Sequence, residues 1–230
     1  MGDWTEYVLA LVLFAASHFL PRMGGMRDRL IARMGRRSYV MAYGLLSVAL
    51  LIWLIAAAGR APFVQIWPQL PWTRWVPNLV MPLAFVLIAC GMGLPQRFTL
   101  GGRQGGRFDP ADPGMTAVSR HPLFLSLALW SGAHLPPTGD LAHVILFGSF
   151  LAMAIAAILA FDAKARRVLG PEAAMFFSRT SILSVAPLVD PAWLRRNGRA
   201  VLSRAGIGLV AWFALLHLHV WLVGASPFPA

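Results

Sequence analysis

Six histidines are the residues of this chain whose side chains could bind a metal ion or carry a proton. They are His18, His121, His134, His143, His217 and His219. At least five of them lie in or at the ends of strongly apolar runs. An ionisable side chain is costly in such surroundings and normally faces the interior of a helix bundle. The histidines therefore indicate a ligand site or a polar path inside a membrane protein.

The composition is that of a membrane protein. Of the 230 residues, 58% are hydrophobic and 13% are charged, whereas soluble domains carry about 25% charged residues. Runs close to the ~20 residues needed to cross a bilayer cover 4–20, 38–58, 77–95, 120–137, 139–161 and 205–224. We expect an all-α, polytopic helical bundle of about six transmembrane helices, forming a single membrane domain over 1–230.

The basic residues predict how the helices are oriented. Segments 21–37, 96–120 and 162–204 carry six, four and eight of the 20 lysines and arginines, which is 18 in total. Short loops rich in Lys and Arg stay in the cytoplasm. We therefore expect a multi-pass protein of the bacterial inner membrane with both termini in the periplasm. Residues 163–177, within the third basic segment, are expected to form a short amphipathic helix.

The net charge of +11 is accounted for by this topology and by contact with anionic membrane lipids. No nucleic-acid-binding module accompanies it, so nucleic acid is excluded as a partner. Cys90 is the only cysteine, which excludes an intramolecular disulfide and a cysteine-based metal site. We expect Cys90 to be a small core residue.

Spacing separates the histidines into groups. His121 and His134 are 13 residues apart, which on a helix is ~220° of rotation and ~20 Å of rise, so they cannot share one metal ion. The predicted topology places His18 and His121 near the cytoplasmic side and the other four near the periplasmic side. The pattern W-x-x-x-H places Trp130 and His134 one turn apart on one buried face.

Several motifs together resemble the NnrU family of bacterial membrane proteins. These are His18 followed by an arginine-rich loop, then SRHP, W-x-x-x-H, GD, ILFGSF and FDAKARRVLG. The resemblance covers roughly residues 8–190 and leaves 205–224 as an extra C-terminal helix. It implies an association with nitrogen-oxide metabolism in denitrifying bacteria. The family is also similar to 15-cis-zeta-carotene isomerase, a membrane protein that uses haem b.

The resemblance implies that haem b is bound by His18 and His134. Arginines at the membrane edge would pair with its propionates, and Arg120 and Arg22 are placed for this role if the haem lies inward. Depth in the membrane favours His121 over His134 as the partner of His18, so both pairs stay open. The isomerase has a cysteine where this chain has Ser131, which argues against thiolate ligation. If the protein is an enzyme, we expect a haem-dependent isomerase acting on a hydrophobic substrate, such as a polyene lipid, or a redox protein.

Two alternatives come from other classes of protein. SRHPLFLS and LGPEAAMFF are similar to the signature of membrane methyltransferases of the isoprenylcysteine and phospholipid type, which bind S-adenosylmethionine. Phe124 stands where those enzymes have Tyr, and Asp162 is the only acidic residue nearby. The third class is a non-enzymatic assembly factor for a respiratory complex, in which the histidines would only form hydrogen bonds between helices.

Overall fold

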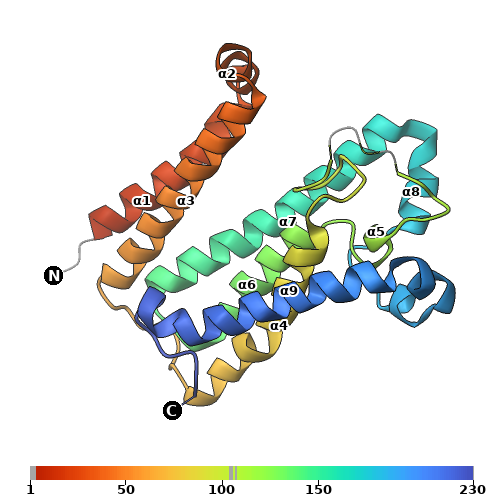
Figure 1. Ribbon diagram of the computed structural model, residues 1–230. Helices are drawn as coiled ribbons and strands as arrows, with labels where there is room; N and C mark the ends of the chain where they lie inside the picture. The colour runs from red at the N-terminus through yellow and green to blue at the C-terminus, as the bar shows by residue number, and fades with distance from the viewer. Residues whose placement is uncertain (1–3, 104–105, 107, 230) are drawn as a thin grey trace. The chain divides into compact units, whose positions relative to one another are not determined.

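The computed structural model describes residues 4–103, 106 and 108–229, without the side chain of Arg22, and this part of the chain is helical. The α-helices are α1 (Trp4–Phe19), α2 (Met26–Met34), α3 (Arg36–Arg60), α4 (Trp75–Gly91), α5 (Met115–Val118), α6 (Pro122–Thr138), α7 (Leu141–Leu169), α8 (Ala173–Arg179) and α9 (Pro191–Val223) (Figure 1). Short 3₁₀ turns lie between them: η1 (Leu20–Arg22), η2 (Pro71–Arg74), η3 (Gly170–Glu172) and η4 (Ala186–Val189).

Each of the six predicted apolar runs falls on a helix. Four stretches within the described residues are long and apolar enough to cross a membrane: Arg36–Arg60, Pro71–Gly91, Leu141–Arg179 and Pro191–Val223. Helices α1 and α6 have 16 and 17 residues, so they are about 24 and 26 Å long, against ~30 Å of hydrocarbon. The all-helical membrane character is confirmed. The number of about six transmembrane helices stays a prediction.

The chain divides into two compact units: Met1–Pro68 with Thr138–Leu146, and Gln69–Pro137 with Phe147–Ala230. In the first unit α1 packs along α3 (Figure 1). Tyr7, Ala10 and Phe14 form the buried face of α1, because residues three and four apart share one side of a helix. The buried residues of α3 are Tyr39, Leu54, Ala57 and Ala58.

Within the first unit, backbone hydrogen bonds join the connection after α3 to the residues just before α7. The N–H groups of Ile66 and Trp67 donate to the carbonyl of Gly139, at 2.8 and 3.1 Å, and the Tyr7 hydroxyl donates to the carbonyl of Ala142 at 2.8 Å. Gly139 has a φ of 60°, and a Cβ there would collide with the Trp67 carbonyl oxygen. Only glycine meets both demands.

In the second unit α4 packs against α9. The helices approach so closely that a Cβ on Gly208 would lie 2.7 Å from the carbonyl oxygen of Phe85. Arg204 of α9 donates to the carbonyls of Cys90 and Met92, at 3.3 and 3.0 Å, and so satisfies the free C-terminal end of α4. Cys90 is 1% exposed, which confirms the prediction of a core residue.

Three segments differ from the sequence-based prediction. The stretch 21–37, interpreted as a loop, contains the end of η1 and all of α2. Residues 163–177 do not form one helix. Helix α7 continues to Leu169, and Gly170, which has a φ of 55°, then interrupts the helix before α8 begins at Ala173. Helix α9 begins 14 residues before the predicted run, because Pro191 starts it and the Asp190 side chain caps it by accepting from the Ala192 N–H at 2.8 Å.

Candidate functional site

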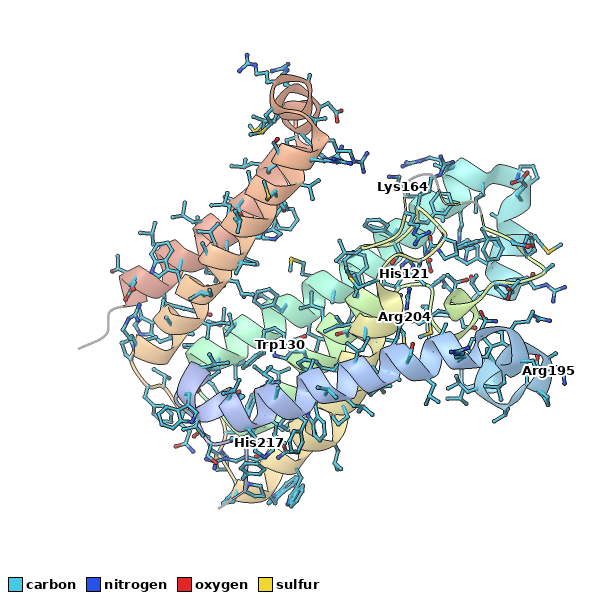
Figure 2. The ribbon with its side chains drawn as sticks, in the orientation of Figure 1. His121, Trp130, Lys164, Arg195, Arg204 and His217 are labelled. Atoms are coloured by element: carbon cyan, nitrogen blue, oxygen red, sulfur yellow. The ribbon has the colours of Figure 1, made fainter. Side chains whose placement is uncertain are left out.

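His121 lies immediately before α6 (Figure 2), and both nitrogens of its ring have protein partners. The Nε2 atom lies 2.8 Å from Oδ1 of Asp162 on α7. The Nδ1 atom lies 3.2 Å from the hydroxyl of Thr99, which belongs to the loop after α4. A carboxylate only accepts hydrogen bonds, so Nε2 carries the proton donated to Asp162. Both nitrogens of the His121 ring are therefore occupied by protein partners.

Arg120 binds the same carboxylate. Its Nε donates to Oδ1 of Asp162 at 2.9 Å and its Nη2 donates to Oδ2 at 2.6 Å. Its Nη1 donates to the Thr180 carbonyl at 3.3 Å, and the guanidinium carbon lies 5.0 Å from the centre of the Phe177 ring. This bidentate geometry adds both energy and a fixed orientation to the Arg120–Asp162 ion pair.

The three side chains form a buried cluster. The side chains of Arg120 and Asp162 are 10% and 13% exposed, and that of His121 is 1% exposed. Gln96 supports the cluster from the loop after α4, since its Nε2 donates to the Arg120 carbonyl at 2.9 Å. A buried charge is tolerated only when it is paired and hydrogen-bonded. The cluster therefore connects the residues just before α6 with α7, with the loop after α4 and with the end of α8. It also leaves no ring nitrogen of His121 for a ligand.

His134 has different surroundings, toward the other end of α6. Its Nδ1 donates to the Trp130 carbonyl at 2.7 Å. Its ring lies 5.7 Å from that of Trp130 and stacks on Phe147 with 5.1 Å between centres. Trp130 in turn packs edge-on against Phe150 of α7. The placement of Trp130 and His134 one turn apart is confirmed, and the site is an aromatic one.

His18 lies in the first unit, near the end of α1. Its Nδ1 donates to the Phe14 carbonyl at 2.9 Å. Its ring lies 4.3 Å from that of Phe14 and 5.7 Å from that of Tyr43. His18 and His134 therefore share one arrangement, in which the backbone carbonyl one turn earlier takes the Nδ1 proton. That arrangement fixes the tautomer whose lone pair is on Nε2, one of the two ring nitrogens through which a histidine can bind a metal.

The other histidines have local partners. His143 places Nδ1 2.8 Å from Oδ1 of Asp140 at the start of α7. His217 donates from Nδ1 to the Phe213 carbonyl at 2.9 Å, and His219 donates from Nδ1 to the Ala225 carbonyl at 2.8 Å. Among the described residues, no three His, Cys, Asp or Glu side chains gather into a metal site. A haem iron needs only one or two protein ligands.

The structure brings Arg120 and His121 together and adds Asp162, which we did not select from the sequence. The signal was available, because Asp162 is the only acidic residue between Asp140 and Glu172 and follows a long apolar run. A carboxylate in that position needs a partner. The side chain of Arg22 lies outside the described residues. Ser131 is fully buried and donates to the Leu127 carbonyl at 2.7 Å.

A pocket of about 550 Å³ lies near this cluster in the second unit. Its walls come from the loop after α4 and from the segment around α8, and they include Arg97, Phe98, Phe108, Glu172 and Phe176. Pockets of a few hundred Å³ that combine aromatic walls with a few charged groups hold small molecules. One basic and one acidic side chain suit a ligand that carries both charges.

The comparisons with known proteins identify one family. The family model described as NnrU protein matches residues 6–227, nearly the whole chain and including α9. No curated protein and no solved structure matches the chain.

Proposed function

The chain belongs to the NnrU family. We propose that it is an inner-membrane protein that binds haem b through His18 and His134. The observation that carries the proposal is the shared arrangement of the two rings. In each, the backbone carbonyl one turn earlier accepts the Nδ1 proton, at 2.9 Å from His18 and 2.7 Å from His134. This contact is the usual outer support of a metal-binding histidine.

The hydrogen bonds of the His121 ring argue against it as the second ligand. Binding iron through Nε2 would break its 2.8 Å hydrogen bond to Asp162, and binding through Nδ1 would displace Thr99. Arg120 is engaged in the same way, because pairing with a propionate would cost it the two hydrogen bonds to Asp162. We therefore assign Arg120 and His121 a positioning role and keep Arg22 as the candidate partner of a propionate.

The side chains around the two histidines suit a macrocycle. Phe14 and Tyr43 beside His18, and Trp130 and Phe147 beside His134, provide flat apolar surfaces that exclude water. A low dielectric and the choice of axial ligands are the means by which a protein tunes haem iron. A bound haem would supply a redox or small-ligand centre, which fits the family's association with nitrogen oxides or a cis–trans isomerisation of a polyene lipid.

A visible absorption spectrum of the detergent-purified protein, expressed with haem supplementation, tests the proposal. We expect a Soret band in the wild type that is lost in His18→Ala and in His134→Ala and retained in His121→Ala. His217→Ala is the matched control, since His217 also donates from Nδ1 to the carbonyl one turn earlier but is not a proposed ligand. Absence of the band from the supplemented wild type would disprove haem binding.

A second candidate function rests on the pocket of about 550 Å³. Its walls include Leu169, Glu172, Met175 and Phe176, which lie in the stretch that is similar to the methyltransferase signature. Glu172 would pair with the amino group of S-adenosylmethionine and Arg97 with its carboxylate. Calorimetric titration tests this: wild-type protein should release heat on binding and Glu172→Gln should bind more weakly. A wild type that gives no binding heat removes this candidate.

A further inference from the structure

Helix α2 lies at the end of the α1–α3 pair in the first unit. It has nine residues, about 14 Å at 1.5 Å per residue, and is too short to cross a bilayer. Gly25 and Gly35 flank it with φ of 71° and 80°, which lets the chain turn sharply on either side. The membrane-length helix α3 begins directly afterwards at Arg36. Helix α2 therefore adjoins the N-terminal end of a helix that is long and apolar enough to cross a membrane.

The surface of α2 has an apolar side and a polar side. Met26, Leu30 and Met34 are spaced by four residues and so share one side of the helix, and they are 44%, 36% and 44% exposed. Asp28 lies about 160° around the helix from Leu30, at 100° per residue. None of the residues of α2 is buried in the described protein. The apolar side is thus partly exposed in the described protein.

The charge around this apolar side is strongly positive. Residues 26–37 contain five arginines and one acidic residue. Arg27 pairs with Asp28 at 3.2 Å, and its guanidinium carbon lies 6.0 Å from the centre of the Tyr39 ring, which anchors α2 on α3. Arg29, Arg33, Arg36 and Arg37 form no ion pair within the described part of the chain. Their guanidinium groups can each bind a phosphate through two hydrogen bonds.

We infer that α2 is an interfacial helix that binds acidic phospholipids, with its arginines on the headgroup phosphates and Met26, Leu30 and Met34 in the acyl boundary. An acidic lipid satisfies both sides of the helix, since one molecule supplies an anionic group and hydrocarbon. A soluble polyanion supplies only the first and would leave the apolar side in water. This inference does not depend on haem binding and concerns a different surface.

Spin labels on the full-length protein test the inference. In a Cys90→Ala background, Leu30→Cys and Asp28→Cys would be labelled separately and placed in nanodiscs of phosphatidylcholine, with or without phosphatidylglycerol. We expect the label at position 30 to be exposed to oxygen and protected from a water-soluble nickel chelate, and to move deeper with phosphatidylglycerol. The label at position 28 should stay accessible to the chelate in both nanodiscs. Equal accessibility of the two labels to the chelate would overturn the interfacial placement.

Charge variants test the acidic-lipid part separately. Arg29→Gln with Arg33→Gln should abolish the extra depth that phosphatidylglycerol gives to the label at position 30. The matched control is Arg195→Gln with Arg199→Gln, which removes the same charge from the start of α9 and should leave that depth change intact. A depth change that survives in the α2 variant, or that is absent from the wild type, would overturn the binding of acidic lipids.

Discussion

Arg120 and Asp162 lie 42 residues apart in sequence and meet through two short hydrogen bonds, of 2.9 and 2.6 Å. His121 donates to the same carboxylate, so one acidic residue compensates a guanidinium and orients an imidazole. All three side chains are nearly excluded from solvent. The pair fixes the start of α6 on α7 and so positions the helix that carries Trp130 and His134.

Asp162→Asn should destabilise the protein strongly. The amide cannot balance the Arg120 charge and presents donors as well as an acceptor to groups that only donate. Breaking a buried ion pair costs about 3–5 kcal/mol, which corresponds to a fall in Tm on the order of 10 °C for a chain of this size. Thermal unfolding of the detergent-purified protein would measure it.

The matched control for that variant is Asp28→Asn. Asp28 pairs with Arg27 at 3.2 Å, but their side chains are 82% and 46% exposed. An exposed ion pair contributes roughly 0–1 kcal/mol, so this Tm should change little. Similar Tm values for Asp162→Asn and Asp28→Asn would contradict the role given to the buried cluster.

Gly208→Ala tests the close approach of α4 and α9. The new methyl group would lie 2.7 Å from the Phe85 carbonyl oxygen, so the helices must move apart, and overpacking of this kind costs about 1–3 kcal/mol. Gly206→Ala is the control on the same helix, because a Cβ there meets nothing within 4 Å. The control should match or exceed wild-type stability, since alanine favours the helix. Unfolding curves with the opposite ranking would show that the two helices do not pack as described.

Gly139→Ala tests the backbone link between the α3–α4 connection and α7. Its φ of 60° already strains any L-residue, and the Cβ would also collide with the Trp67 carbonyl oxygen. The control is Gly224→Ala: Gly224 has a φ of 79°, and a Cβ there would meet nothing within 4 Å. This variant therefore measures the backbone strain without a steric clash. The loss of Tm should be clearly larger at position 139. Equal losses would mean that the 64–67 segment does not hold Gly139.

The sequence predicted the helices well where hydrophobicity alone determines them. The apolar runs at 4–20 and 120–137 correspond to α1 and α6 within two residues at each end, because the same side chains that favour lipid also favour helix. It missed α2 and the first 14 residues of α9. Both are rich in arginine and are helical for local reasons: glycines on either side of α2, and the Asp190 cap with Pro191 for α9.

The site was predictable only in part. The histidines and Arg120 stand out in the sequence because charged and polar side chains are costly in apolar runs. Spacing cannot show that Asp162 and Thr99 contact the two nitrogens of the His121 ring, or that Nδ1 of His18 and of His134 donates to a backbone carbonyl. Nor does spacing pair residues 42 positions apart, so the contact of Asp162 with Arg120 emerged only from the fold.

The predicted topology can be tested with single cysteines, because Cys90 is the only native one. In a Cys90→Ala background, Ser178→Cys probes the third basic segment and Ser226→Cys probes the C-terminal end. Both positions are exposed. Since 18 of the 20 basic residues lie in segments predicted to be cytoplasmic, a membrane-impermeant maleimide should label position 226 in intact cells. Position 178 should react only after the membrane is permeabilised. Labelling of position 178 alone in intact cells would mean that the orientation is the reverse of the predicted one. Labelling of both positions would mean that α9 does not cross the membrane.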